Sequence, residues 1–394
     1  MDTVKLEKLL GGLSAQQFLD EYWQQKPLLI RQAFPNFQSP ISPEELAGLS
    51  CDTEAPARIL AEKGLDTPWQ ALYGPFDEDT FASLPETHWT LLVNDVDRYY
   101  PELRNDIIEP FRFIPDWRID DLMVSFAVEG GSVGPHTDEY DVFLLQAYGQ
   151  RRWQIADHAY TDDNLIPNID LRILKHFDSE QEWILNPGDM LYLPPNIIHH
   201  GVAMNDCMTY SVGFRAPSQQ DLLGAYIEDC VSQPSAKQRY QDPKRLLQDN
   251  SGEITRSNLD ALTQLLRSGL QDDPEFIDQC IGKHLTDIKG DAPSTAPSTA
   301  TTENSYIIGQ SYQRSASSRF AYVMYPDKVN FFANGRCTIY PAKFTESAKF
   351  LCEQTYYEAK ELQARMQIPE FSECFTQLLK EQAIFSQQDT NETP

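Results

Sequence analysis

Two stretches of this sequence, GGSVGPHTD at 130–138 and WILNPGDMLYLPPNIIHH at 183–200, decide how we interpret the chain. In the first stretch, the spacing of His136 and Asp138 puts both side chains on one face of a strand or of the turn that ends it. In the second stretch, a Gly-Asp turn leads into a short apolar strand and a Pro-Pro turn, and His199 follows. Two imidazoles and a carboxylate form a known set of metal ligands, so we expect these side chains to meet at one metal ion.

The surroundings make this pattern more specific than His-x-Asp alone, which arises by chance in many chains. Short apolar segments rich in β-forming residues run through the middle of the chain, and Gly, Pro, Asn and Asp separate them. Many short strands with turn signals between them predict a barrel or a double-sheet jelly roll. We predict strands at 89–93, 122–128, 142–147, 152–155, 182–185, 190–193 and 209–214.

Helical segments flank this strand-rich region on both sides. Ser14 and Ser42 each begin a predicted helix near the N-terminus. After Pro217 the apolar spacing predicts amphipathic helices, and a low-complexity segment then leads to a small unit with strands around an Asn-Gly turn. This unit closes with predicted helices at 345–367 and 369–385. We divide the chain into a domain at 1–217, a helical region at 218–290, a linker at 291–304 and a C-terminal unit at 305–394.

The composition limits the kinds of partner and the compartment. The chain has 32 Lys and Arg against 59 Asp and Glu, a net charge of −27, which argues against a protein that follows nucleic-acid phosphates. An acidic surface suits a basic partner, although it can also serve only to keep a protein soluble. The segment 305–394 is close to neutral, so we expect no direct DNA binding. Unpaired cysteine spacing and the lack of an apolar signal or membrane segment indicate a reduced cytoplasmic protein.

Further motifs around these stretches resemble the JmjC oxygenases. They are RRW at 151–153, PGD at 187–189, FLDEYW at 18–23, KPLLIR at 26–31 and YSVGFRAP at 210–217. The order of strand-rich core, helical region and small final unit is similar to that of the bacterial ribosomal oxygenases. The resemblance implies an α+β chain with a double-stranded β-helix core of the jelly-roll, JmjC/cupin-like kind. A helical bundle and a small winged-helix-like domain would follow this core.

The resemblance also implies roles for residues of the site. His136, Asp138 and His199 would hold Fe(II), with 2-oxoglutarate as cosubstrate and dioxygen as oxidant. The cosubstrate's far carboxylate needs a cation, for which Arg151 is expected and Arg152 is the competitor. Ser211 would donate a hydrogen bond to the same cosubstrate, and no catalytic residue is needed beyond the metal centre. His200 is a departure, because bacterial relatives usually have an acidic residue there.

The function that the resemblance implies is 3-hydroxylation of an arginine in a basic large-subunit ribosomal protein, with release of succinate and carbon dioxide. A homodimer would form through the helical region. Glu129, Glu139, Tyr140 and Asp141 are the candidates for holding a substrate guanidinium. The alternatives are a histidine hydroxylase, an N-methyl-lysine demethylase, or a non-catalytic cupin-like binding module.

Overall fold

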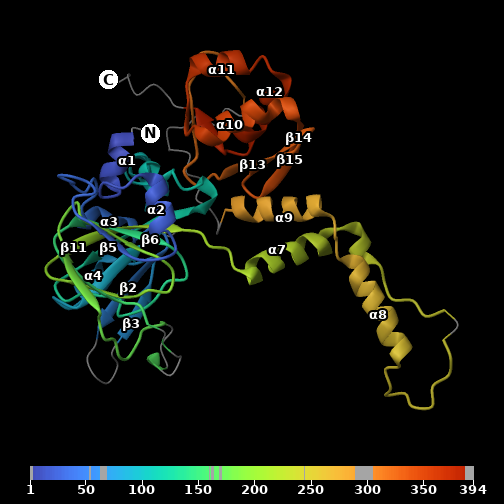
Figure 1. Ribbon diagram of the computed structural model, residues 1–394, viewed down its shortest axis with the longest axis horizontal. Coiled ribbons are helices and arrows are strands. Elements are labelled where there is room, and N and C mark those ends of the chain that lie inside the picture. The colour runs from blue at the N-terminus through green and yellow to red at the C-terminus, as the bar shows by residue number, and fades with distance from the viewer. Residues whose placement is uncertain are drawn as a thin grey trace. The chain divides into compact units, whose positions relative to one another are not determined.

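The computed structural model describes residues 3–52, 55–62, 69–158, 160, 164–167, 171–243, 245–288 and 305–386. The chain divides between Ala216 and Pro217 into two compact units, each with its own hydrophobic core (Figure 1). Among the described residues, no helix is long and apolar enough to cross a membrane. The expected linker at 291–304 lies outside the described residues.

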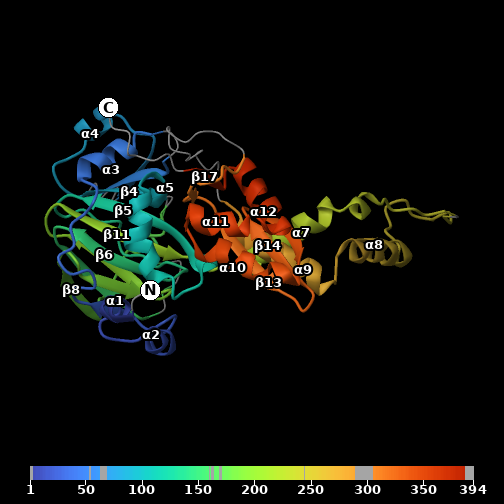
Figure 2. The ribbon, with the colours of Figure 1, turned by 90° about the horizontal axis from the view of Figure 1, so that it is seen from above.

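Two antiparallel sheets build the N-terminal unit (Figures 1 and 2). The larger has the order β1-β9-β6-β11-β5-β4-β2-β3, and the smaller has the order β10-β7-β8. The strands of the larger sheet are β1 (Leu28–Ile30), β2 (Ala57–Glu62), β3 (Trp69–Tyr73), β4 (Trp89–Val93), β5 (Ile119–Ala127), β6 (Val142–Tyr148), β9 (Met190–Leu193) and β11 (Cys207–Phe214). The smaller sheet contains β7 (Arg151–Ala156), β8 (Gln181–Leu185) and β10 (Ile198–Ala203).

Both faces of the larger sheet are buried, which explains the nearly continuous apolar runs in its central strands. Along β6, Val142 and Leu144 pack between the two sheets with Trp153. The alternate residues Phe143 and Leu145 join the larger core on the other face. Every second residue of these strands therefore faces the space between the two sheets, and the candidate functional site lies in this space.

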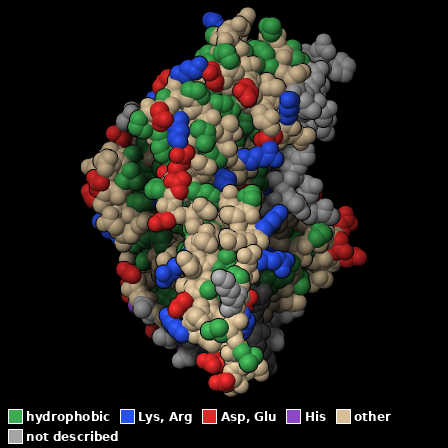
Figure 3. Space-filling model, turned by 90° about the vertical axis from the view of Figure 1, so that its right-hand side faces the viewer, with side chains coloured by type: hydrophobic (Ala, Val, Ile, Leu, Met, Phe, Trp, Pro, Cys, Tyr) green, Lys and Arg blue, Asp and Glu red, His purple; other side chains and the backbone are tan. Residues whose placement is uncertain are grey.

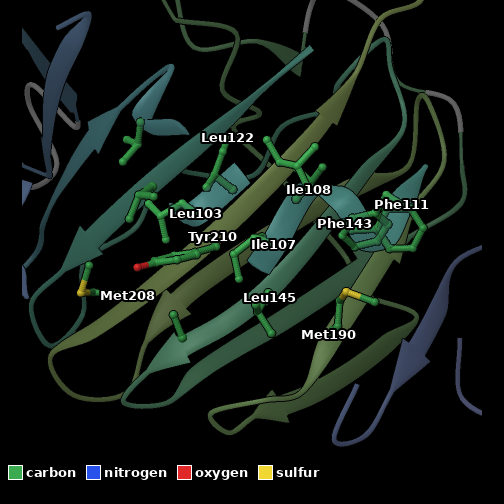
Figure 4. Close-up of a cluster of buried hydrophobic side chains, with 14 of the residues drawn as sticks. Leu103, Ile107, Ile108, Phe111, Leu122, Phe143, Leu145, Met190, Met208 and Tyr210 are labelled. Atoms are coloured by element: carbon green, nitrogen blue, oxygen red, sulfur yellow. The ribbon is translucent and has the colours of Figure 1, made fainter. Parts of the chain in front are cut away.

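Helical segments cover the outer face of the larger sheet. One short helical stretch contributes Ile107, Ile108 and Phe111, which pack against Phe143 and Tyr210 of the strands (Figure 4). Ser14 and Ser42 form capping boxes at the starts of two of the helices, as their sequence contexts predict. The helical elements of this unit are α1 (Thr3–Leu9), α2 (Ala15–Glu21), α3 (Pro43–Leu49), α4 (Glu78–Ala82), α5 (Val96–Tyr99), α6 (Pro101–Leu103), η1 (Arg104–Ile108), η2 (Glu109–Phe111) and η3 (Asp116–Arg118).

The second unit combines helices with two small sheets, β16-β12-β17 and β13-β14-β15. Helix α9 packs on α7 and on the β13-β14-β15 sheet, so the helical region and the C-terminal strands belong to one compact unit. Its helices are α7 (Gln219–Ser232), η5 (Pro234–Lys237), α8 (Arg256–Gly269), α9 (Pro274–Thr286), η6 (Ala342–Phe344), α10 (Thr345–Glu353), α11 (Ala359–Arg365) and α12 (Pro369–Lys380). Its strands are β12 (Tyr312–Arg314), β13 (Phe320–Met324), β14 (Lys328–Ala333), β15 (Arg336–Pro341), β16 (Tyr356–Tyr357) and β17 (Ile384–Ser386).

The two helices predicted near the C-terminus are shorter than expected. The first is broken at Tyr356–Tyr357, which form β16 and pair with β12. Tyr357 is fully buried and its hydroxyl donates to the carbonyl of Leu351, so tertiary packing overrides the helical pattern here. The second ends at Lys380, and Ile384–Ser386 pair with the other edge of β12.

The close approach of α9 to its sheet gives a stability prediction. A Cβ atom built on Gly282 would lie 2.3 Å from the ring of Phe332, whereas one on Gly224 in α7 would meet nothing within 4 Å. We expect Gly282→Ala to lower the free energy of unfolding by about 1–3 kcal/mol through overpacking. Gly224→Ala, the matched control, should raise it by about 0.5–1 kcal/mol. Urea denaturation measures the change in the free energy of unfolding of each variant. Equal changes in the two variants would contradict the packing argument.

Candidate metal centre

Three side chains that are far apart in the sequence meet in the N-terminal unit. The ligand atoms of His136, Asp138 and His199 all lie within 4.8 Å of one another. The Nε2 atom of His136 is 3.9 Å from one carboxylate oxygen of Asp138, and that of His199 is 3.6 Å from the other. Within the described part of the chain, this is the one cluster of such residues that could hold a metal ion.

A short backbone pairing brings these residues together. The N–H of His136 donates to the carbonyl of His199 at 3.1 Å, and the N–H of His199 donates back at 2.9 Å. The N–H of Asn196, a residue with a left-handed φ of 67°, donates to the carbonyl of Asp138. The turn before β10 thus closes onto the segment after β5, which explains how ligands about sixty residues apart share one site.

Hydrogen bonds to the backbone fix the orientation of both histidines. Nδ1 of His136 lies 2.9 Å from the carbonyl of Gly134, and Nδ1 of His199 lies 3.0 Å from that of Ile197. A carbonyl only accepts, so each Nδ1 carries the proton and each Nε2 keeps its lone pair for a metal. Burial and the neighbouring His136 lower the pKa of His199 to about 4, so this imidazole is neutral at pH 7.

The structure separates His199, the expected third ligand, from its neighbour His200. His200 lies outside the cluster, and its ring makes an edge-on contact with Phe177 at 6.1 Å. Burial and the positive charges around it lower the pKa of His200 to about 4. Successive side chains on β10 point to opposite faces, which places only His199 between the sheets.

A cavity of about 340 Å³ adjoins the three ligands, and Arg151, Trp153 and Ser211 line it. Arg151 is 3% exposed, and its Nε and Nη2 atoms have no hydrogen-bond partner among the described residues. A buried cation without a partner is costly, so a bound anion fits this position. Arg152, the competitor, does not line the cavity, because alternation along β7 points it to the other face.

The same cavity is also lined by Asp121, Asn94 and Tyr140. The carboxylate of Asp121 accepts hydrogen bonds from the side chain of Asn94 at 3.1 Å and from the N–H of Asp95 at 3.2 Å. Burial, followed by the charges of Asp95 and Asp120, raises the pKa of Asp121 to about 6. A guanidinium would relieve this repulsion and pair with the carboxylate.

Of the four residues that we expected to hold a substrate guanidinium, Tyr140 alone lines the cavity. Asp141 is fully buried on the other face of the sheet, where it binds Arg118 and accepts from the hydroxyl of Tyr192 at 2.6 Å. Glu129 and Glu139 are not among the lining residues. Sequence reasoning missed Asp121, although its alternation with Met123 and Ser125 along β5 was a usable signal.

Two stacked antiparallel sheets with two histidines and a carboxylate between them define a metal-dependent oxygenase of the JmjC class. A family model described as JmjC domain matches residues 106–222, which include all three candidate ligands. A model described as AraC-like ligand binding domain matches residues 175–270. That stretch begins before β8 in the N-terminal unit and ends after α8 in the second unit.

The chain belongs to the JmjC-domain ribosomal oxygenases. It is 37% identical to the ribosomal protein uL16 3-hydroxylase of Escherichia coli over 274 residues, which are 70% of this chain and 72% of that protein. It is also 37% identical to a probable ribosomal oxygenase of Haemophilus influenzae, over 67% of this chain and 66% of the other. The resemblance to ribosomal oxygenases in the sequence is thereby confirmed.

Solved structures support the same family over nearly the whole chain. The crystal structure of E. coli YcfD matches with a TM-score of 0.77 and 30% identity, over 95% of this chain and 98% of that one. Another YcfD structure contains cobalt and 2-oxoglutarate, and matches with a TM-score of 0.74. The expected α+β fold with a JmjC/cupin core is therefore confirmed.

Proposed function

We propose that this chain is an iron(II)- and 2-oxoglutarate-dependent hydroxylase that acts at C3 of an arginine in ribosomal protein uL16. The observation that carries the proposal is the buried guanidinium of Arg151, whose Nε and Nη2 have no hydrogen-bond partner among the described residues, in the same cavity as the three candidate ligands. His136, Asp138 and His199 would hold iron(II), and Arg151 with Ser211 would hold the far carboxylate of the cosubstrate. Such an enzyme works in the cytoplasm, where ribosomal proteins are made.

Each part of the cavity has a separate task in this reaction. Iron(II) and 2-oxoglutarate, when bound, would supply the oxidation by dioxygen, which puts one oxygen atom on the substrate carbon and one into succinate, with release of carbon dioxide. The protein orients the two ligand imidazoles through Gly134 and Ile197 and pairs the cosubstrate with Arg151. Packing of apolar side chains between the sheets, such as Leu144 and Trp153, keeps water from the inner end.

Succinate release tests the proposal directly. The protein, loaded with iron(II) under anaerobic conditions, is mixed with 2-oxoglutarate, air and a uL16 peptide that contains the target arginine. We expect succinate in proportion to peptide, and a mass gain of one oxygen atom on arginine. Oxidation of a histidine, or loss of a methyl group from lysine, would favour one of the alternative oxygenase functions. Binding of peptide without any turnover would favour a non-catalytic module.

Asp121 supplies a prediction on substrate recognition. Asp121→Asn should lower kcat/KM for the arginine substrate by about 30-fold, because removing one partner of a desolvated charge pair costs at least about 2 kcal/mol. The KM for 2-oxoglutarate should stay unchanged. Glu139→Gln is the matched control, since it removes a nearby carboxylate that does not line the cavity.

The pH dependence checks the same assignment. The pKa of Asp121 is raised to about 6, so the carboxyl group is neutral below that pH and charged above it. The kcat/KM of the wild type for the arginine substrate should therefore rise as the pH passes through this value. Asp121→Asn should lose this step, and a variant that keeps it would show that another group titrates.

The acidic composition and the exposed helices suggest how this enzyme associates with other chains. A net charge of −27 favours encounter with a basic ribosomal protein. The α7–α8 hollow, lined by Ile227, Val231, Leu262, Leu265, Leu266 and Leu270, has a volume of about 410 Å³. Hydrophobic side chains lie between charged ones on the side of the molecule that carries α8 (Figure 3). We propose that two copies of the chain bury these faces in a homodimer.

Light scattering on size-exclusion fractions tests the dimer. Leu266→Glu places a charge in the α7–α8 hollow and should convert the dimer to a monomer without lowering the melting temperature of the N-terminal unit. Leu247→Glu is the control, because Leu247 is also exposed but does not line the hollow. A monomeric wild type, or a dimer that both variants retain, would contradict the assignment.

We propose that residues 305–394 form a winged-helix-like domain and that this domain docks onto other proteins. The arrangement of α10, α11 and α12 beside the antiparallel β13-β14-β15 sheet supports this view. A nucleic-acid role has less support, since 305–394 has 9 Lys and Arg against 10 Asp and Glu.

A further inference from the structure

A second hollow opens beside the cavity of the metal centre. It has a volume of about 340 Å³ and is lined by residues 55–58, residues 73–75 and Asn94. Arg58 and Asn94 also line the cavity that contains the three candidate ligands. The two spaces therefore share a wall, and a chain whose side chain enters the cavity can continue into this side hollow.

Backbone hydrogen bonds fix the walls of the side hollow before anything binds. The N–H of Gly74 donates to the carbonyl of Ala57 at 2.8 Å, and the N–H of Asn94 donates to that of Pro56 at 2.9 Å. The N–H of Phe76 donates to the carbonyl of Ser50 at 3.1 Å and fixes the turn that follows. A preformed surface of this kind requires little ordering on binding, which favours its use for recognition.

The chemistry of the walls suits a polypeptide. Arg58 and Tyr73 are direct cross-strand partners in the β2–β3 pair. Tyr73 is 60% exposed, so one ring at the side hollow is open to contact. Arg58 lines both spaces, so its guanidinium is a donor at the junction between them. A peptide offers both a carbonyl acceptor for this guanidinium and a side chain that can pack on the ring.

We propose that the side hollow holds the substrate segment that flanks the target arginine. A main-chain carbonyl of this segment accepts from the guanidinium of Arg58, and a neighbouring side chain packs on Tyr73. This inference rests on the proposed function, because the target side chain must enter the cavity for its neighbours to reach the hollow. It adds a selection rule, since an extended polypeptide is favoured over free arginine or a peptide that lacks the flank.

Kinetics with a peptide series tests this inference. Peptides that carry the target arginine are shortened from one end and then from the other. We expect one truncation to raise the peptide KM of the wild type by about tenfold, as loss of one aromatic anchor does. Tyr73→Ala should raise the KM of the full peptide by a similar factor, while kcat and the KM for 2-oxoglutarate stay unchanged. The truncated peptide should not distinguish Tyr73→Ala from the wild type.

Tyr148→Ala is the matched control, since Tyr148 is 50% exposed on β6 and lines neither space. An unchanged KM of the full peptide in Tyr73→Ala would overturn the inference while leaving the hydroxylase intact. Equal losses on full and truncated peptides would overturn it too, because the ring would then act elsewhere. A wild type that turns over no arginine peptide would instead overturn the proposed function. In that case, peptide affinities measured by fluorescence anisotropy would still compare Tyr73→Ala with the wild type and so test the side hollow.

Discussion

Replacing His136, Asp138 or His199 by alanine should abolish metal binding and turnover, while His200→Ala keeps both. The three side chains converge within 4.8 Å, and a metal held by two ligands instead of three loses most of its affinity. Loss of a residue that only orients a ligand costs about 10- to 100-fold in affinity, so loss of a ligand itself should cost more than about 100-fold. Cobalt(II) binding followed by visible absorption measures this without requiring turnover.

The comparison of the two adjacent histidines makes this test specific. His199 and His200 share a strand and a depressed pKa, but only His199 is buried and belongs to the cluster, whereas His200 is half-buried. A general effect of removing an imidazole from this strand would appear in both variants. If His200→Ala lost cobalt and His199→Ala kept it, the assignment of the third ligand would be wrong.

The metal ligands were predictable because their positions depend on local rules. The spacing of His136 and Asp138 follows from alternation along an extended chain, and the turn at Asn196 marks where the third ligand arrives. The strand that carries His199 was not predicted, since His-His-Gly is neither apolar nor alternating. Its pairing with β7 arises from tertiary contacts, which no local pattern of those residues contains.

The rest of the cavity lining was harder to predict because distant strands build it. Arg58 comes from β2 and Asp121 from β5, and the order β5-β4-β2 brings them to one wall. The local sequence determines neither the order of the strands in the sheet nor how deeply a given carboxylate is buried. Acidic residues close to the metal motif in the sequence were therefore expected to bind the substrate, but one of them, Asp141, forms an ion pair with Arg118 on the opposite face. Proximity in sequence is a poor guide in a sheet, where neighbours along the chain face apart.

Arg151 carries the second large prediction. Arg151→Leu should weaken 2-oxoglutarate binding by about 2–5 kcal/mol, or roughly 30- to 4,000-fold in Kd, because the far carboxylate loses its buried cation. Arg151→Lys should recover part of the affinity, since ammonium keeps the charge without the planar pair of donors. Arg152→Leu is the control on the opposite face of β7. Calorimetry on the cobalt-loaded protein measures each Kd.

The stability of the cosubstrate-free protein separates a binding role of Arg151 from a structural one. Its Nε and Nη2 atoms are buried without partners among the described residues, so the folded protein bears the cost of this charge. A leucine removes that cost, and Arg151→Leu should therefore melt at the same or a higher temperature than the wild type. Adding 2-oxoglutarate should raise the melting temperature of the wild type but not that of the variant. A variant that is less stable and still responds to 2-oxoglutarate would show that Arg151 supports the sheet and that another residue binds the cosubstrate.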